Sequence, residues 1–392
     1  MKNWTLLIYA NGNNEMEPEI FNSFLSAKKA PSTKNINVVM QIGRADKTLV
    51  KLINPSKIIF KDANDWCGVR RYLIDSGEAI LLEDDCFPNM AHPKNLYNFI
   101  KWGVEKFPAK HYMLILSGHG ISYIGGLTDT TLDEFYIMGI PEMCQAINSI
   151  KKDLNTHIDI LLLDMCYMNL IEVLYELGHE EKPSCKEIVT YFRTGPLEGI
   201  PLEKLIISVE KNIHIESLDL FTKNLINDIE LPLISYNPSK KELEMIKDYF
   251  NILAKCYLAM EYKDPKKIYN LMNKSKEEIP CNIYIDKIND LLSSLIVYTN
   301  SISTKNYINV ICTDLGKAIV IYKKLSFSKN NNWTEILSNY KEYDESKEIS
   351  LLPIKLSNGA IYSFLSNLNP ELSGGEVLQI LSKLRTYYAN NK

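Results

Sequence analysis

The segment Tyr112-Met-Leu-Ile-Leu-Ser-Gly-His-Gly120 is an aliphatic run that ends in a histidine between two glycines. A second run, Ile158-Asp-Ile-Leu-Leu-Leu-Asp-Met-Cys166, ends in a cysteine. Both runs are short and apolar, as expected for strands that are covered on both faces of a parallel sheet. Because open α/β sheets build their sites at the carboxyl ends of the strands, we expect His119 and Cys166 to meet at that edge.

Short apolar runs alternate with helical periodicity throughout residues 1–235. This alternation is typical of βαβ units, so it predicts an α/β fold with a mostly parallel sheet and helices on both faces. The predicted strands are 4–10, 36–42, 112–117, 158–164 and 187–192, and the predicted helices are 93–107, 141–151 and 170–178.

After residue 235, the sequence pattern changes from alternating strand and helix signals to mainly helical signals. Ser239 followed by Glu242 is a capping-box pattern, and it predicts a long helix that runs to about residue 259. The other elements predicted in this part are a helix over 283–301 and strands over 307–312 and 317–322. We therefore predict two domains, an α/β domain over 1–235 and a helix-rich C-terminal domain over 236–392.

Composition and charge narrow the class of partner. Of the 392 residues, 46% are hydrophobic and 23% are charged, as in an ordinary globular protein. The net charge of −4 and the lack of a basic stripe argue against a nucleic-acid or anionic-membrane partner. No stretch approaches the ~18 consecutive apolar residues that a membrane-spanning helix needs.

The N-terminal segment and the cysteines bear on location and metal binding. Met1-Lys-Asn-Trp-Thr-Leu-Leu-Ile-Tyr-Ala10 lacks the features of a signal peptide, so a cytoplasmic location is expected unless a leader was removed, in which case the protein is secreted. The eight cysteines include no CxxC pair, and no Cys/His cluster has zinc spacing. We therefore predict no metal site.

Cys166 is the candidate nucleophile. Asn169 with Glu172 three residues later forms a capping-box pattern, which predicts that a helix begins just after this cysteine. The partial positive charge of a helix N-terminus stabilises a thiolate. The alternative is a buried and inert strand-end cysteine, which is the commoner case for an arbitrary free cysteine. The Asp-x-Cys context and the matching His-Gly pair favour the reactive role.

His119 is the candidate general base and acid for that thiol. Gly120 allows close approach of a substrate, so its backbone N–H and that of Cys166 could form an oxyanion hole, in which each donor is worth about 2.7–4 kcal/mol. The alternative is an incidental histidine in a strand-to-loop turn. The sequence indicates no third catalytic carboxylate.

Asp164 lies two residues before Cys166, and residues at this spacing on a strand point to the same face. Its carboxylate could line a specificity pocket and pair with an arginine or lysine of a substrate. The alternative is an aspartate that anchors a loop.

These motifs resemble those of the clostripain family of cysteine peptidases, which shares a clan with caspases, gingipains, legumain and separase. The clan marker is an aliphatic run ending in His-Gly, then a second run ending in an acidic or small residue and Cys, here 114–120 and 160–166. The gap of 47 residues between His119 and Cys166 is typical of that clan. Further blocks similar to the family are Leu7-Ile-Tyr-Ala-Asn-Gly-Asn-Asn-Glu-Met16, Arg71-Tyr-Leu-Ile74, Ile140-Pro-Glu-Met143, 316–322 and 333–340.

The resemblance implies a caspase-like α/β core and a cysteine endopeptidase that uses a His119–Cys166 dyad. It also implies a peptide or protein substrate with a basic P1 residue, read by a pocket that contains Asp164. A cytoplasmic enzyme of this kind would suit the maturation of a precursor peptide. No cofactor is required by this mechanism, although the resemblance leaves a need for Ca2+ open.

One segment departs from the family pattern. In Tyr191-Phe-Arg-Thr-Gly-Pro-Leu-Glu-Gly-Ile-Pro201, the family's Pro and Gly are kept as Pro196 and Gly199, but its acidic residue and its Trp are missing. We expect Arg193 and Thr194 in this segment to contact the substrate. If Arg193 points into the pocket, it neutralises Asp164 and disfavours basic P1 residues.

Three questions stay open at this point. The departure from the family pattern at 191–201 supports a second hypothesis, namely a peptide-binding protein that has the fold but does not catalyse cleavage efficiently. Many family members mature by self-cleavage between the histidine and the cysteine, and Lys151-Lys152 is the basic pair in that interval. The same two lysines also fit the last turn of a helix. The oligomeric state is not indicated.

Overall fold

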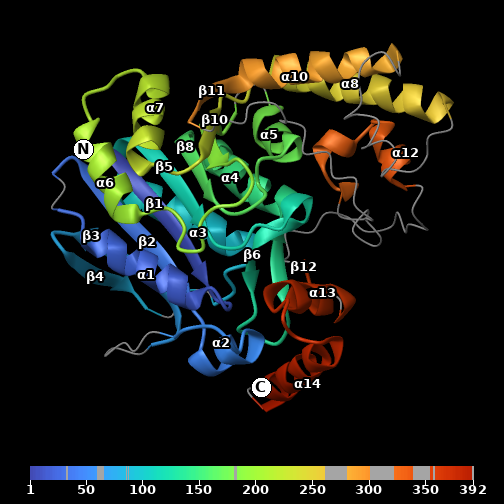
Figure 1. The fold of residues 1–392 in the computed structure, drawn as a ribbon. Helices are drawn as coiled ribbons and strands as arrows, with labels where there is room; N and C mark the ends of the chain where they lie inside the picture. The colour runs from blue at the N-terminus through green and yellow to red at the C-terminus, as the bar shows by residue number, and fades with distance from the viewer. Residues whose placement is uncertain are drawn as a thin grey trace.

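The computed structural model describes residues 1–31, 34–59, 66–84, 86, 88–180, 183–260, 280–300, 322–338, 354–355 and 358–390. Within these residues, a nine-stranded sheet in the order β11-β10-β9-β8-β5-β1-β2-β3-β4 forms the centre of the molecule (Figure 1). Its strands are β1 (Lys2–Gly12), β2 (Ile36–Arg44), β3 (Gly68–Asp75), β4 (Glu78–Glu83), β5 (Ala109–Ser117), β8 (Ile158–Asp164), β9 (Cys185–Tyr191), β10 (Leu233–Tyr236) and β11 (Ile296–Thr299).

The middle of this sheet is parallel and its two margins are antiparallel. β9, β8, β5, β1 and β2 pair in parallel, and antiparallel strands continue the sheet beyond β2 and beyond β9. The five strands predicted from the sequence are these five parallel strands. β1 has β2 on one side and β5 on the other, so the direction of chain winding reverses between β1 and β5, where open α/β sheets form a crevice.

Helices cover both faces of the sheet, as predicted. The helices of the described residues are α1 (Glu17–Lys28), α2 (Lys47–Ile53), α3 (Pro93–Lys106), α4 (Ile140–Leu154), α5 (Ile171–Gly178), α6 (Leu202–Lys211), α7 (Leu218–Ile229), α8 (Lys240–Ala259), α10 (Ile283–Leu295), α12 (Trp333–Ser338), α13 (Asn358–Leu368) and α14 (Gly374–Asn390). Leu7 and Tyr9 of β1 pack with α3, α4 and α5, whereas Leu6 and Ile8 pack with α1, α6 and α7. Each such buried side chain contributes about 1.5–3 kcal/mol, which is why the strands read as continuous apolar runs.

One predicted helix is shorter than expected. The helix predicted over 283–301 ends at Leu295, and Ile296–Thr299 forms β11. Ile-Val-Tyr-Thr is a β-branched and aromatic stretch, and its pairing with β10 outweighs the helical periodicity before it. The strand pair predicted over 307–312 and 317–322 lies outside the described residues, except for Tyr322.

The chain on the two sides of residue 235 shares one sheet and one apolar cluster. That boundary falls inside β10, and β11 beyond it pairs with β10. Leu253 of α8 and Ile288 of α10 belong to the same cluster as Leu7. The division into domains 1–235 and 236–392 stays a prediction.

A second, smaller sheet lies beside the carboxyl edge of the first. It contains β6 (Gly125–Asp129), β7 (Tyr136–Gly139) and β12 (Ile354–Lys355), in the order β12-β7-β6. The C-terminal helices α13 and α14, red in Figure 1, pack there against α2 and Phe135. Tyr388 donates a hydrogen bond to the carbonyl oxygen of Thr130 (2.9 Å), and Asn369 donates one to the carbonyl oxygen of Ile53 (3.1 Å).

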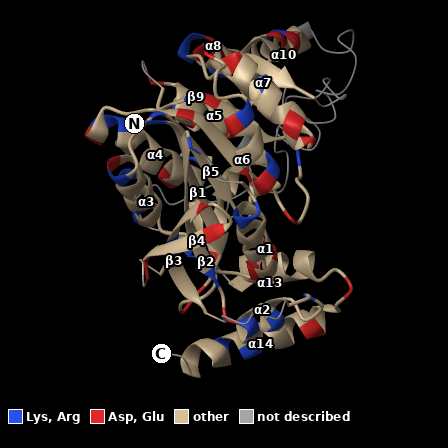
Figure 2. Cartoon of the chain, turned by 90° about the vertical axis from the view of Figure 1, so that its left-hand side faces the viewer, with Lys and Arg blue, Asp and Glu red and all other residues tan. Residues whose placement is uncertain are grey.

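Charged residues of the two signs are mixed on the face that Figure 2 draws. In Figure 2, Lys and Arg are interspersed with Asp and Glu over the helices on the face shown. None of the described helices is both long and apolar enough to cross a bilayer.

Candidate active site

His119 and Cys166 follow the tips of two neighbouring strands. β5 and β8 are parallel, and Ser117 is the register partner of Asp164. Each candidate therefore lies two residues beyond the same row of the sheet. The N–H of Gly118 also donates to the carbonyl oxygen of Asp164 (3.3 Å), which holds the two connections together. The common edge expected for these two residues is thus present.

Gly120 is in backbone contact with Cys166. A Cβ atom built on Gly120 would lie 2.0 Å from the carbonyl oxygen of Cys166 and 3.0 Å from its nitrogen. No real side chain tolerates such distances, so only glycine fits here. Tyr167, the residue after Cys166, has a φ of 59° and donates its N–H to the carbonyl oxygen of Arg193 (2.6 Å). This left-handed conformation costs energy for a tyrosine, and the surrounding contacts must hold it.

Among the described residues, the two predicted oxyanion donors have no backbone hydrogen-bond partner. The bridge between Gly120 and Gly126 is made by the residues around Gly120: His119 accepts from Leu127 (2.9 Å) and Ile121 donates to Gly125 (2.7 Å). In this antiparallel pattern the N–H of Gly120 itself points away from β6. Within the part of the chain that the structure describes, neither this N–H nor that of Cys166 donates a backbone hydrogen bond.

The ring of His119 is bound by a carboxylate that the sequence did not indicate. Nε2 of His119 forms a hydrogen-bonded ion pair with Oε1 of Glu15, which lies three residues beyond β1. The side chain of Glu15 is 1% exposed and that of His119 is 19% exposed. Burial alone would raise the pKa of Glu15, but the charge and the hydrogen bond of His119 outweigh it and hold that pKa below its usual value.

Glu15 occupies Nε2, so Nδ1 is the nitrogen of His119 left for Cys166. Cys166 is half-buried. Among the described residues, no hydrogen bond joins the Cys166 sulfur to His119. The hydrogen bond of the His119 ring goes to Glu15 instead. Catalytic hydrogen bonds are often long in a substrate-free enzyme and tighten when substrate binds, so a dyad of these two residues stays a prediction.

A small pocket opens beside Cys166. It is lined on one side by Met16, Glu19, Ile20 and Ser23 at α1, and on the other by Gly118, Asp164, Tyr191 and residues 196–199. Three of the lining residues are acidic, namely Glu19, Asp164 and Glu198, and none of the described lining residues is Lys or Arg. Lys57 pairs with Glu19 from outside the lining (2.8 Å). The pocket is therefore suited electrostatically to a cation.

Asp164 is buried beneath this pocket and anchors the segment that follows β9. Its carboxylate accepts hydrogen bonds from the hydroxyl groups of Ser117 and Tyr191 (2.5 Å to Tyr191), and from the N–H of Ile200 (3.1 Å). Burial raises its pKa, and these hydrogen bonds act against that shift. A Cβ on Gly199 would lie 2.6 Å from Oδ2, so this loop covers the carboxylate closely. These contacts are those of the loop-anchoring alternative, and direct binding of a substrate cation by Asp164 stays a prediction.

Arg193 and Thr194 lie outside this pocket. Both residues are exposed, and neither lines it in the described structure. The neutralisation of Asp164 by Arg193, which the sequence raised, is therefore not seen here. Their assignment to substrate binding stays a prediction.

The helix after Cys166 begins later than the capping-box pattern predicted. α5 starts at Ile171, and its N-cap is Leu170, without a side-chain cap. Asn169 instead donates to the carbonyl oxygen of Phe192 (3.2 Å) and accepts from Tyr236 (2.8 Å). The predicted cap was wrong because tertiary partners hold the Asn169 side chain. The helix therefore begins five residues after Cys166, and stabilisation of the thiolate by its N-terminus stays a prediction.

Lys151 and Lys152 lie in the last turn of α4. Lys151 donates to the carbonyl oxygen of Pro183 (3.0 Å), and Lys152 pairs with Glu180 (3.3 Å). Cleavage there would require this turn to open, and self-cleavage at this pair stays a prediction. Among the described residues, no group of three or more His, Cys, Asp or Glu could hold a metal ion. A requirement for Ca2+ stays an expectation from the family resemblance.

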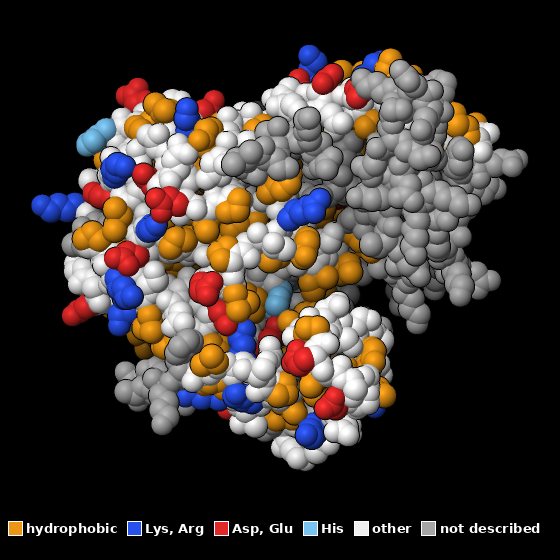
Figure 3. Space-filling view, in the orientation of Figure 1, with side chains coloured by type: hydrophobic (Ala, Val, Ile, Leu, Met, Phe, Trp, Pro, Cys, Tyr) orange, Lys and Arg blue, Asp and Glu red, His pale blue; other side chains and the backbone are white. Residues whose placement is uncertain are grey.

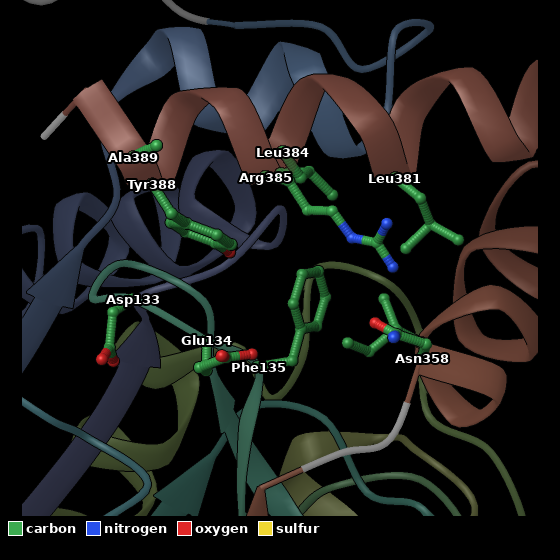
Figure 4. A pocket seen from close by; sticks show the side chains of 10 residues that line it. Asp133, Glu134, Phe135, Asn358, Leu381, Leu384, Arg385, Tyr388 and Ala389 are labelled. Atoms are coloured by element: carbon green, nitrogen blue, oxygen red, sulfur yellow. The ribbon is translucent and has the colours of Figure 1, made fainter.

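The surface view shows a hollow beside the C-terminal helices. Figure 3 shows the surface indented between the main body and the C-terminal helices, with a histidine at the floor of the hollow. A larger cavity of about 500 Å3 lies between α14 and the turn before β7, lined by Asp133, Phe135, Arg385 and Tyr388 among others (Figure 4). Its described lining contains neither histidine nor cysteine, so the smaller pocket is the better candidate for covalent chemistry.

Comparisons with known proteins found a family model and solved structures that match this chain. The model of the clostripain family matches residues 19–349. A search of curated proteins found no match. Two solved structures of a secreted C11 cysteine protease from Bacteroides thetaiotaomicron are similar in fold. One, in complex with an irreversible peptide inhibitor, has 13% identity and a TM-score of 0.51, covering 76% of this chain and 84% of that one.

The other structure of that Bacteroides protease, called iotapain, has 11% identity and a TM-score of 0.50, covering 76% of this chain and 86% of that one. An inactive zymogen C11 protease from Parabacteroides distasonis has 15% identity and a TM-score of 0.46, covering 64% of this chain. The present chain spans 66% of that zymogen, just under two thirds of its length. At these identities the likeness concerns the fold.

Proposed function

Because the chain belongs to the clostripain family of cysteine peptidases, we propose that His119 and Cys166 form the dyad with which it cleaves peptide bonds. The observation that carries this proposal is the register of β5 and β8, which brings the two loops to one edge with Gly120 against the backbone of Cys166. In the part of the chain that the structure describes, the N–H groups of Gly120 and Cys166 make no backbone hydrogen bond, which supports an oxyanion hole in the same place.

The reaction has two halves. Nδ1 of His119 takes the thiol proton, and Sγ of Cys166 attacks the carbonyl carbon of the scissile bond. The N–H groups of Gly120 and Cys166 stabilise the oxyanion of the tetrahedral intermediate. His119 then gives its proton to the leaving amine, and the C–N bond breaks to leave a thioester. Water, deprotonated by His119, attacks this thioester and releases the carboxylic acid and the thiol.

We propose a preference for a basic P1 residue, as the sequence suggested. Support comes from the acidic side chains around the pocket beside Cys166, since a cation bound there interacts favourably with Glu19, Asp164 and Glu198. Asp164 is already hydrogen-bonded, so in this arrangement it acts through its field more than through a direct contact. A precursor peptide with Lys or Arg before its processing site is the substrate that fits this proposal.

The alternative is a peptide-binding protein without efficient catalysis. The observation that favours this alternative is that Cys166 and His119 share no hydrogen bond among the described residues. It predicts tight binding of a basic peptide with no cleavage over long incubation. Neither proposal decides the cellular location, and the cytoplasmic location stays a prediction.

The experiment compares the wild-type protein with Cys166→Ala on fluorogenic peptides that differ only in P1, with Arg, Lys, Gln or Leu. Cys67→Ala is the matched control, because Cys67 is an exposed cysteine outside the site. We expect turnover of the Arg and Lys peptides by wild type and control, and none by Cys166→Ala. A peptidyl acyloxymethyl ketone should modify Cys166, and His119→Ala should abolish this labelling. Equal turnover by Cys166→Ala and wild type would refute the dyad.

A further inference from the structure

We infer that Glu15 is a positioning residue of the catalytic site, which binds Nε2 of His119 and so completes a Cys166–His119–Glu15 arrangement. The inference deepens the proposed function and rests on it, because a positioning role has meaning only if His119 acts on Cys166. It assigns a catalytic purpose to a buried carboxylate on β1's exit loop, a part of the chain far from both motifs in sequence.

The sheet brings Glu15 to this place. Ala10 of β1 pairs with Ser117 of β5, and Ser117 pairs with Asp164 of β8, so the three strands share one row. The connections that leave this row carry Glu15, His119 and Cys166 in turn. β1 and β5 also flank the point at which the winding of the sheet reverses, where the connections diverge and leave space for a site.

Asparagines fix the loop that carries Glu15. Asn11 accepts from the N–H of Asn13 (3.1 Å), and Asn14 accepts from the N–H of Met16 (2.8 Å). The amide groups of Asn11 and Asn14 both donate to the carbonyl oxygen of Thr128 in β6, at 2.8 and 2.9 Å. Asn13 donates to the buried Asp129 (2.7 Å). The loop is thus tied to the hairpin that follows His119, so Glu15 and His119 are held in a fixed relation before substrate arrives.

Among the described residues, the side-chain hydrogen bond of the Glu15 carboxylate is to His119, and the charge of Lys57 also favours its ionised form. Its Oε1 binds His119, whereas its Oε2 is buried and has no hydrogen-bond partner among the described residues. A buried carboxylate is costly unless a charge or donor compensates it, and the His119 ring is the group in contact with it. Because Glu15 accepts a hydrogen bond from Nε2–H, the neutral ring carries its hydrogen on Nε2 and presents the lone pair of Nδ1 to the thiol. The same carboxylate favours the imidazolium that forms when the thiol loses its proton.

An ion pair that only stabilises the fold can be distinguished from the Glu15–His119 pair by its effect on catalysis. Glu17 supplies the comparison, since it is also buried, lies two residues away, and pairs with Arg44 (2.6 Å) outside the site. Loss of either ion pair should lower stability, but only the loss of the Glu15 carboxylate should change how the dyad handles its proton.

The test measures kcat, KM and the pH profile of kcat/KM for Glu15→Gln, Glu15→Asp and Glu17→Gln, with a Lys or Arg fluorogenic peptide. We expect Glu15→Gln to lower kcat about 100-fold or more with little change in KM, by comparison with the effect of losing the orienting aspartate of a serine-protease triad. The alkaline limb of its profile should move to lower pH, because the imidazolium loses its carboxylate. Glu15→Asp should recover part of kcat, and Glu17→Gln should keep the wild-type profile.

Two outcomes overturn the inference. One is a folded Glu15→Gln protein with wild-type kcat and pH profile while Cys166→Ala is inactive; the dyad then stands and Glu15 is structural. If Glu15→Gln does not fold, Glu15→Asp decides, because its shorter side chain withdraws the carboxylate from Nε2. An unchanged kcat and profile in that folded variant would count against positioning. Activity in Cys166→Ala would instead refute the proposed function itself.

Discussion

The ring of Phe364 in α13 stands edge-on to the ring of His119, with centroids 5.5 Å apart and an interplanar angle of 81°. Phe364 also meets Phe135, which precedes β7 (6.1 Å). Helix α13 thus contacts the candidate general base through an aromatic side chain. Residues at the two ends of the chain, Glu15 and Phe364, contact the same imidazole.

Phe364→Ala should lower kcat/KM about tenfold, because the ring restricts the orientation of His119 and an edge-on aromatic pair contributes about 0.5–1.5 kcal/mol. Leu378→Ala on α14 is the control, as Leu378 is an exposed leucine of the same helical pair. Steady-state kinetics on the P1 peptide series measures both variants. Equal activity of Phe364→Ala and Leu378→Ala would show that α13 does not support the site.

Gly120→Ala should reduce kcat by at least 100-fold, because its methyl group would collide with the backbone of Cys166 and displace an oxyanion donor. Gly359→Ala provides the matched control, since a Cβ there meets no atom within 4 Å. Kinetics and thermal unfolding are measured together for both. Full activity in Gly120→Ala would mean that the two loops are not in backbone contact in the working enzyme.

Asp164→Asn should lower the preference for basic P1 residues about tenfold, since it removes a negative charge from the acidic pocket. Arg193→Ala should leave that preference within about twofold, because Arg193 is exposed and lies outside the lining. The quantity measured is the ratio of kcat/KM for the Lys and Gln peptides. A large change in Arg193→Ala with none in Asp164→Asn would reverse the roles proposed for these residues.

Glu172→Gln should change the pH dependence of stability. Burial raises the pKa of Glu172 from 4.5 to about 7, and it accepts a hydrogen bond from Tyr322 (3.0 Å). Between these two pH values the folded protein holds this proton and the unfolded chain does not, so stability falls as pH rises, by about 3 kcal/mol from this residue.

Urea unfolding at a series of pH values measures this effect. Glu172→Gln should remove the part of the decline between pH 4.5 and about 7 that this residue causes. Glu371→Gln, a substitution of an exposed glutamate, should retain the wild-type decline. Parallel curves for wild type and Glu172→Gln would show that the Glu172 carboxyl titrates alike in the folded and unfolded states.

Local pattern was enough to place the candidate dyad. Burial on both faces makes β5 and β8 continuous apolar runs, and parallel pairing obliges the residues that follow them, His119 and Cys166, to leave the same edge. The same reasoning recovered the five parallel strands and the helices α3, α4 and α5 on one face of the sheet. These features depend on periodicity and burial, which neighbouring residues in the chain encode directly.

The remaining features depend on which elements become neighbours. Glu15 reaches His119 only because β1 lies next to β5, and no local signal in the loop after β1 states that pairing. Asn169 matched a helix cap but is held by Phe192 and Tyr236, and the helical periodicity after Ile283 gives way to β11 where β10 offers an edge. A side chain's chemistry is a property of the chain, whereas its partner is chosen by packing among segments distant in sequence, where several contacts compete and the global arrangement of lowest free energy prevails.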